Sequence, residues 1–221
     1  MKAVIISDLH LGSTHMMCDD FLKFLDGLSD GRTLILNGDT IDRWRTNLTR
    51  SHKFVLTRIR QESLKRKVVW IYGNHDELYV MDKPANILFR PSYNIGEKIF
   101  ITHGHNFEKV MNFNRGFIWL FYAIHKIRIA LGAESIHVAH LAKRFPRLYR
   151  VLCDKIANNA IEYAKENGYE VIVCGHSHKA DDYIKDGVRY INTGAWTEHP
   201  ICYVYIDEEA IVLTRYANNS Q

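Results

Sequence analysis

Near its beginning the chain carries Ala3-Val4-Ile5-Ile6-Ser7-Asp8-Leu9-His10, a short apolar run that ends in a carboxylate and an imidazole. Similar runs, rich in Val and Ile, recur along the chain, and each leads into a polar loop that contains Gly, Asp, Asn or His. They span residues 33–36, 68–72, 99–102 and 171–174. Runs this short and this apolar predict strands that are buried on both faces.

Segments with helical spacing of apolar residues separate the early runs. The first holds Phe21, Leu22, Phe24, Leu25 and Leu28, and the second holds Phe54, Val55, Ile59 and Leu64. Strands that alternate with helices predict parallel strands joined by crossover helices. Asp186-Gly187, between two later apolar runs, predicts a hairpin turn, and two more strands are expected at residues 202–206 and 211–216. The pattern predicts an α/β sandwich with parallel and antiparallel strands.

Residues of about 106–152 interrupt this alternation. The stretch has mostly helical spacing and holds an aromatic cluster, Phe113, Phe117, Trp119, Phe121 and Tyr122. Because two neighbouring strands are expected to flank it, we interpret it as a helical cap inserted into a single domain that covers residues 1–221. Pro146 is expected to kink or break any helix that runs through it.

Composition and charge narrow the class of protein. The chain has 221 residues, 47% of them hydrophobic, which suits one sizeable core. A net charge of +4 is only mildly basic and does not by itself indicate a nucleic-acid binder. Cys18, Cys153, Cys174 and Cys202 form no C-x-x-C pair and are expected to be reduced thiols in a cytoplasmic protein. We expect neither a signal peptide nor a transmembrane helix.

Polar residues with metal-binding side chains follow the predicted strands. They are Asp8, His10, Asp39, Asn74, His103, His176 and His178. In open α/β sheets, ligands bind where loops leave the carboxyl ends of strands. Oxygen and nitrogen donors without a thiolate suit Mn²⁺, Fe, Zn²⁺ or Mg²⁺. One carboxylate can bridge two such ions about 3.5–4 Å apart, as in phosphatases.

The spacing of these residues has a physical reason. Asp8 and His10 are two residues apart, as are His176 and His178, and such pairs point the same way in an extended loop. Glycines at positions 12, 38, 73, 104, 175 and 194 flank the set. They permit sharp turns and a close approach of metal or phosphate to the backbone.

Five motifs together resemble the signature of the calcineurin-like metallophosphoesterases. They are Asp8-Leu9-His10, Gly38-Asp39-Thr40-Ile41-Asp42, Gly73-Asn74-His75-Asp76, His103-Gly104-His105 and Gly175-His176-Ser177-His178. The resemblance implies a four-layer α/β/β/α sandwich and two divalent metal ions. It implies a first ion held by Asp8, His10, Asp39 and His178, and a second held by Asp39, Asn74, His103 and His176. Asp39 would bridge them.

The chemistry of such a site assigns further roles. A hydroxide that bridges the two ions would attack phosphorus in line. His75 is expected to protonate the leaving oxygen or to stabilise its charge, and Asp76 is expected to orient His75 through the far ring nitrogen. Asp42 is either a support for a ligand or a surface charge, and the role of His105 is similarly open.

Within this family the chain most resembles the UDP-2,3-diacylglucosamine pyrophosphohydrolases and their relatives. The likeness rests on residues 7–13, on the helical stretch after His103-Gly104, and on Asn192-Thr193-Gly194-Ala195-Trp196. It implies Mn²⁺-dependent cleavage of a nucleotide-linked lipid into UMP and a lipid phosphate. The best-known branch has Arg where this chain has His75, so the sequence is closer to a divergent branch that keeps His.

The cap and the substrate leave alternatives open. The aromatic cluster either holds acyl chains or belongs to the ordinary core. Lys143, Arg144, Arg147 and Arg150 are either a solvated face or a contact for pyrophosphate or anionic lipid headgroups at the inner face of the membrane, while Lys109 and Arg115 lie nearer the motif loop. The competing functions are a soluble phosphodiesterase or phosphatase of small phosphoesters, a non-catalytic protein-binding scaffold, and a nuclease. The sequence favours a small-molecule substrate over a nucleic acid, and it leaves the oligomeric state open.

Overall fold

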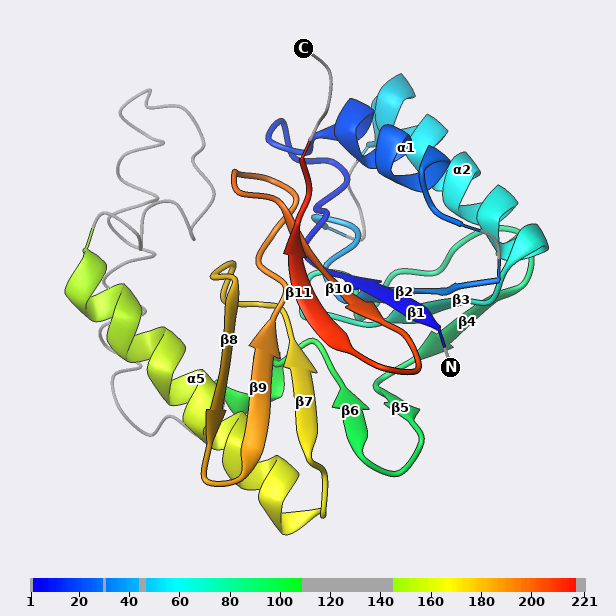
Figure 1. Ribbon diagram of the computed structural model, residues 1–221. Helices are drawn as coiled ribbons and strands as arrows, with labels where there is room; N and C mark the ends of the chain where they lie inside the picture. Colours follow the sequence, from blue (N-terminus) through cyan, green and yellow to red (C-terminus); the bar gives the residue numbers. More distant parts are fainter. Residues whose placement is uncertain (1, 30, 44–46, 109–144, 218–221) are drawn as a thin grey trace.

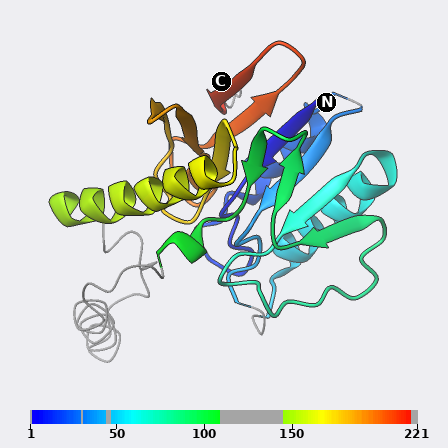
Figure 2. The ribbon, with the colours of Figure 1, turned by 90° about the horizontal axis from the view of Figure 1, so that it is seen from below.

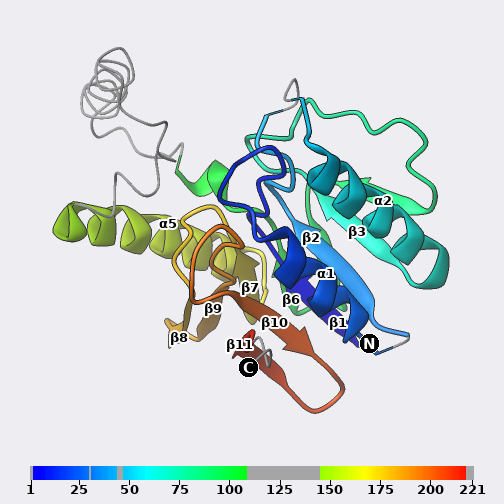
Figure 3. The same cartoon turned by 90° about the horizontal axis from the view of Figure 1, so that it is seen from above.

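Two mixed sheets form the centre of the molecule in the computed structural model, which describes residues 2–29, 31–43, 47–108 and 145–217 (Figure 1). Helices α1 (Cys18–Asp26) and α2 (Arg50–Lys65) lie side by side over one sheet (Figure 3). Helix α5 (Pro146–Glu166) covers the other. Viewed from below, α2 and α5 lie on opposite sides of the paired sheets (Figure 2).

The first sheet has the strand order β11-β10-β1-β2-β3-β4. Its strands are β1 (Ala3–Ile6), β2 (Thr33–Asn37), β3 (Val68–Ile71), β4 (Ile87–Arg90), β10 (Cys202–Ile206) and β11 (Ile211–Arg215). Strands β1 to β4 are parallel, and β10 and β11 continue the sheet in antiparallel pairing. The parallel strands are therefore joined by crossover segments, two of which contain α1 and α2, as the alternation in the sequence predicted.

The second sheet has the order β5-β6-β7-β9-β8. Its strands are β5 (Tyr93–Ile95), β6 (Ile99–Ile101), β7 (Val171–Cys174), β8 (Asp181–Lys185) and β9 (Val188–Asn192). Asp186 and Gly187 both have positive φ, 52° and 83°, as the expected hairpin turn requires. Strands β6 and β7 pair in parallel although the segment 102–170 separates them in the sequence. That segment includes the short 3-10 helix η1 (His105–Phe107) and α5.

Successive side chains of a strand point to opposite faces of its sheet, so the molecule has three apolar layers. One lies between α1, α2 and the first sheet, one lies between the two sheets, and one lies between the second sheet and α5. Val4, Leu34 and Trp70 face α1 and α2, whereas Ile5 and Ile35 face the second sheet. On the far side, α5 packs its alanines and isoleucines, Ile156, Ala157, Ala160, Ile161 and Ala164, on the second sheet. Strands buried on both faces favour apolar residues at nearly every position, which explains the near-continuous apolar runs. The expected α/β/β/α sandwich is confirmed.

Two details differ from the sequence prediction. Strands β4 and β5 were not expected, because their short segments lie beside turn residues and lack a strong apolar run. Phe54 and Leu64 belong to α2 but are 60% and 69% exposed, so the buried stripe is narrower than expected. Helix α5 begins at Pro146, where the missing N–H removes no helical hydrogen bond; the residues before Phe145, on which the expected break also depends, lie outside the described ranges.

The expected cap falls mostly outside the described residues. Positions 109–144, which include the aromatic cluster, Lys109, Arg115, Lys143 and Arg144, are among those not described. Residues 106–108 lie in and after η1, and residues 146–152 form the beginning of α5, so the expected boundary at 152 lies inside one continuous helix. Arg147 and Arg150 are exposed on that helix.

All four cysteines are free thiols; Cys153, Cys174 and Cys202 are buried and Cys18 is partly buried. Among the helices of the described ranges, none is long and apolar enough to span a membrane.

Candidate metal centre

The predicted ligands come from loops at the carboxyl ends of β1, β2, β3, β6 and β7, which meet where the two sheets face each other. Within the described ranges, three groups of His and Asp side chains there offer ligand atoms within 4.8 Å of one another. They are Asp8 with His10 and His178, His10 with Asp39 and His75, and Asp39 with His103 and His176. All expected carboxylate and imidazole ligands therefore lie in groups that share members.

Asp8, His10 and His178 form the first group. His178 Nε2 lies 3.2 Å from Asp8 Oδ1 and 3.1 Å from His10 Nε2. His10 Nε2 is 3.8 Å from the same carboxylate oxygen. All three side chains are buried. The imidazole nitrogens and one carboxylate oxygen thus converge on a small volume away from water.

Asp39 lies between the first group and the remaining histidines. Its Oδ2 atom is 3.2 Å from His103 Nε2, 4.0 Å from His10 Nε2 and 3.9 Å from His75 Nε2. Its other oxygen, Oδ1, accepts a hydrogen bond of 2.9 Å from the backbone N–H of His75. One oxygen is therefore anchored to the polypeptide while the other faces both sets of histidines.

The backbone of these loops is left-handed at five expected ligands, and not extended as the sequence suggested. The φ angles are 55° at Asp8, 50° at His10, 50° at Asp39, 67° at His176 and 57° at His178. Side chains two residues apart converge because both residues adopt this conformation. Non-glycine residues rarely do so, and such strain concentrates at functional sites.

Glycines allow three of the loops to pack directly on ligand side chains. A Cβ on Gly38 would overlap the ring of His103, and one on Gly73 would overlap Asp39. A Cβ on Gly175 would overlap Ser7 and the Asp8 carboxylate. These three glycines are therefore needed because the backbone packs directly against side chains of the candidate site. A sharp turn alone would not impose this requirement.

Further hydrogen bonds fix which atoms of the ligands face the centre. Asp8 Oδ2 accepts from Ser7 Oγ at 2.5 Å and from the backbone N–H of His176 at 3.0 Å, which leaves Oδ1 toward His178. His103 Nδ1 donates to the carbonyl oxygen of Asn37 at 2.9 Å, so Nε2 is the ring atom that faces Asp39. Such contacts set the tautomer and orientation of metal-binding histidines.

Asp42 proves to contact a ligand and is not simply a surface charge. Its carboxylate Oδ1 lies 3.2 Å from Nδ1 of His10. Its carbonyl oxygen accepts a hydrogen bond of 2.6 Å from Nδ1 of His75. The same residue therefore orients His10 through its side chain and His75 through its backbone.

The expected pairing of Asp76 with His75 is wrong. Asp76 is fully buried and accepts hydrogen bonds from the backbone N–H groups of Gly73 at 2.6 Å and Thr40 at 2.8 Å, and from Trp70 Nε1 at 3.1 Å. Burial and the nearby charge of Asp39 raise the pKa of Asp76 to about 6. Asp76 thus ties together the loops after β2 and β3, and Asp42 takes the place expected of it beside His75.

Two other expected residues are less engaged. Asn74 is exposed in the turn that follows β3, next to His75. His105 lies in η1, with its ring centroid 5.6 Å from that of His103 and 6.3 Å from that of His176, and belongs to none of the three groups in the described part of the chain.

Two glutamates were missed from the sequence. Glu108 Oε2 lies 2.7 Å from Nε2 of His176, and Glu198 Oε1 lies 3.9 Å from Nδ1 of His178. Neither belongs to a motif, and Glu108 is 68 positions from its partner. The contact of Glu198 is visible only in the folded chain. For Glu108 the sequence offers one signal, its position shortly after the motif His103-Gly104-His105.

The charges in the centre hold protons in the absence of metal. Burial opposes the charge on His10, but the carboxylates of Asp42, Asp8 and Asp39 outweigh it and raise its pKa to about 10. Burial also opposes the charge on His103, but the carboxylates of Asp39 and Asp8 outweigh it and raise the pKa of His103 to about 9. For Asp39, burial raises the pKa, but the surrounding histidines lower it to well below its ordinary value. The carboxylate of Asp39 is therefore ionised, and its negative charge favours a cation beside it.

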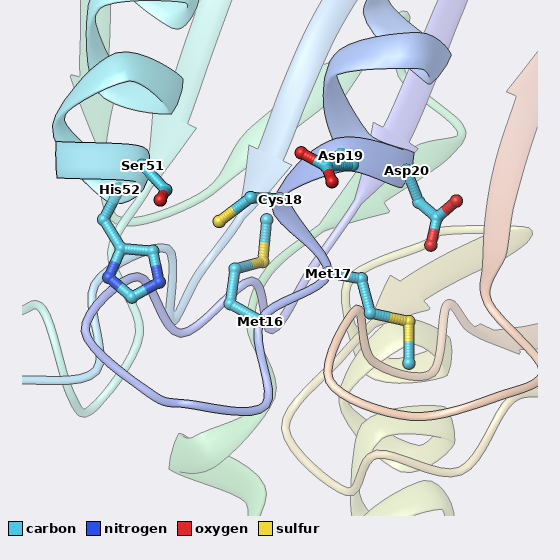
Figure 4. Close-up of a pocket in the computed structure, with 7 residues that line it drawn as sticks. All are labelled: Met16, Met17, Cys18, Asp19, Asp20, Ser51 and His52. Carbon is cyan, nitrogen blue, oxygen red and sulfur yellow. The ribbon is translucent and has the colours of Figure 1, made fainter. Parts of the chain in front are cut away.

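A separate cavity of about 380 Å³ lies where α1 and α2 begin (Figure 4). It is lined by Met16, Met17, Cys18, Asp19, Asp20, Ser51 and His52. His52 Nδ1 accepts a hydrogen bond of 3.1 Å from the backbone N–H of Gly12, two residues after His10. This bond ties α2 to the loop that carries the candidate ligands Asp8 and His10.

The family model for calcineurin-like phosphoesterases matches residues 1–180. The chain therefore belongs to the calcineurin-like phosphoesterase family and is a hydrolase that acts on phosphoesters. The family uses divalent metal ions. The carboxylate and imidazole groups assembled here fit such ions in type and spacing, which supports a metal-binding site in this chain.

Solved structures of similar fold cover nearly the whole chain at low identity. A novel archaeal phosphodiesterase is 18% identical over 98% of this chain and 100% of its own, with a TM-score of 0.49. Vacuolar protein sorting 29 from Cryptosporidium parvum is 13% identical, over 97% and 96%, with a TM-score of 0.48. YfcE, a phosphoesterase from E. coli, is 15% identical, over 99% and 100%, with a TM-score of 0.47. Among curated proteins none matches the sequence.

Proposed function

We propose that this hydrolase binds two divalent metal ions that share Asp39. The first ion would be held by Asp8, His10, Asp39 and His178, and the second by Asp39, Asn74, His103 and His176. The observation that carries the proposal is the position of Asp39 Oδ2, between His103 Nε2 at 3.2 Å and His10 Nε2 at 4.0 Å. Two ions bound there lower the pKa of a water molecule and offset the charge of the phosphoryl oxygens.

His75 is the proposed acid at the leaving oxygen. Its side chain is 32% exposed, so a substrate can reach it, and its Nδ1–H is committed to the carbonyl oxygen of Asp42. Nε2 is consequently the atom that faces Asp39 and the centre. It would donate a proton to the leaving group from the doubly protonated ring, a form that burial opposes by lowering the pKa of His75 and that the charge of Asp39 favours. The edge-to-face contact with His10, with ring centroids 4.9 Å apart, supports this orientation.

For the substrate, we propose a nucleotide-linked lipid similar to UDP-2,3-diacylglucosamine, cleaved at its pyrophosphate with Mn²⁺. The motifs at residues 7–13 and 192–196 support this branch of the family. The long segment between β6 and β7 offers further support, because both of its described ends contact the centre. Glu108 bonds to His176, and Tyr149 on α5 donates a hydrogen bond of 2.6 Å to the carbonyl oxygen of Ser177.

A lipid substrate also carries a proposal for location. The protein would act in the cytoplasm and contact the inner face of the membrane through the segment around residues 106–152. In this proposal the substrate is a small molecule, and nucleic acid is no partner.

The test compares hydrolysis of UDP-2,3-diacylglucosamine with that of bis-p-nitrophenyl phosphate in the presence of Mn²⁺. A strong preference for the lipid supports the proposed substrate. Cleavage of the small diester alone would leave the metal centre in place and favour a soluble phosphodiesterase. If neither is cleaved, or if Asp39→Ala has no effect, the proposed catalytic centre is wrong.

A further inference from the structure

Glu108 stands at the point where the chain leaves η1. Its carboxylate oxygen Oε2 lies 2.7 Å from Nε2 of His176. The side chain of His176 is 15% exposed and that of Glu108 is 39% exposed, so the contact is partly shielded from water. It differs in this respect from the exposed ion pair between Lys98 and Glu170.

The contact assigns the two nitrogens of His176. A ring nitrogen whose hydrogen is donated to a carboxylate has no lone pair for a metal ion, so Nδ1 is the nitrogen that remains for coordination. Glu108 itself joins none of the three groups of candidate ligands in the described residues, whereas His176 groups with Asp39 and His103. Glu108 is therefore a partner of a candidate ligand and not itself a member of a ligand group.

The backbone that presents Glu108 is well anchored. Its N–H donates to the carbonyl oxygen of His105 at 3.2 Å, which closes the 3-10 turn. The preceding residue, Phe107, is buried against α5, and its carbonyl oxygen accepts a hydrogen bond of 2.8 Å from Asn159 Nδ2. The carboxylate thus approaches His176 from a support fixed to both the motif loop and α5.

We propose that Glu108 is a positioning residue for one metal ion only: it holds Nε2–H of His176 and presents Nδ1 to the second ion. The inference rests on the proposed two-metal centre. Carboxylates that support a metal-binding histidine typically change metal affinity about 10- to 100-fold when they are removed. Here the effect should be confined to the second ion, because Glu108 bonds to His176, which groups with Asp39 and His103 and not with Asp8, His10 and His178.

Single-site backgrounds separate the two ions in the full-length protein. His10→Ala removes a ligand of the first ion alone, and His103→Ala removes a ligand of the second alone. We would measure Mn²⁺ affinity in each background by calorimetry, with and without Glu108→Gln, and count the ions bound by the wild type with the same method. Glu170→Gln is the matched control, since it removes the charge of an exposed, ion-paired glutamate.

In the His10→Ala background, Glu108→Gln should weaken the remaining Mn²⁺ site about 10- to 100-fold. In the His103→Ala background, affinity should stay within about two-fold, and Glu170→Gln should change neither site. Equal weakening of both sites, or none, would overturn the inference. If the wild type binds two ions but the results for Glu108→Gln overturn the inference, the proposed function still stands. If the wild type binds fewer than two ions, both the proposed function and the inference fail.

Discussion

Gly38 is the position where a single added methyl group should disturb the centre most directly. It lies between Asn37 and Asp39 with a φ of +85°, and a Cβ there would overlap the ring of His103. The ring has no room to yield, because it is fully buried and its Nδ1 is bonded to the carbonyl oxygen of Asn37. Gly38→Ala must therefore displace either the ring or the loop that carries Asp39.

The expected loss can be worked from this overlap. Restoring ordinary van der Waals separation requires a shift of roughly 1 Å. A misplacement of about 1 Å in a catalytic constellation reduces turnover roughly 10²-fold, which corresponds to about 2.7 kcal/mol of transition-state stabilisation. The left-handed backbone adds a separate stability cost of about 1–2 kcal/mol, because alanine disfavours this conformation.

Gly168→Ala is the control for the backbone term. Gly168 has a φ of +76°, and no atom lies within 4 Å of a Cβ placed there. Both variants should lose the backbone term in urea unfolding, with a further loss in Gly38→Ala from the overlap, but only Gly38→Ala should lose Mn²⁺-dependent cleavage of bis-p-nitrophenyl phosphate. If kcat/KM of the two variants agrees within about three-fold, the reasoning from the overlap is refuted.

Three further outcomes are expected. Because His10 and His103 have pKa values raised to about 10 and about 9, both are protonated at pH 7.5 without metal, so Mn²⁺ binding should release about two protons and tighten as pH rises toward 9. Calorimetry in buffers of different ionisation enthalpy measures this, and binding without proton release would contradict it. Asp42→Asn should weaken Mn²⁺ binding about 10- to 100-fold in the His103→Ala background, where only the first ion remains; unchanged affinity would show that its contact with His10 Nδ1 is incidental. Glu62→Gln should lower the free energy of unfolding by about 3–5 kcal/mol, because this buried carboxylate binds Arg66 at 2.7 Å and Arg58 at 3.0 Å; a loss under 1 kcal/mol in urea unfolding would contradict it.

The sequence predicted most of the fold because the central strands are buried on both faces. Burial leaves almost only apolar residues in β1, β2, β3 and β7, with polar Thr33 and Asn37 at the two ends of β2, and each run ends at a polar loop, so both ends of these strands are visible. Strands β4 and β5 lie at sheet edges and have exposed positions, so they lack the continuous apolar run that marks the central strands. In α2 the apolar pattern predicted too many buried residues, because Phe54 and Leu64 are apolar but exposed.

The members of the candidate site were predictable from chemistry, and their supports were not. A ligand such as His178 is visible as a metal-binding side chain beside a glycine in a motif. Its neighbour Glu198 and the contact of Glu108 with His176 depend on loops that meet only in the folded chain. Asp76 was assigned to His75 because the two are adjacent in sequence, but adjacent side chains in a tight turn point in different directions.

The most direct test of the account is the number of Mn²⁺ ions bound per chain, measured by equilibrium dialysis with metal analysis, for the wild type and for Asp39→Asn. The account predicts two ions in the wild type and markedly weaker binding of both in Asp39→Asn, because Asp39 is shared. Two ions held as tightly by Asp39→Asn as by the wild type, or a single ion in the wild type at saturation, would contradict it.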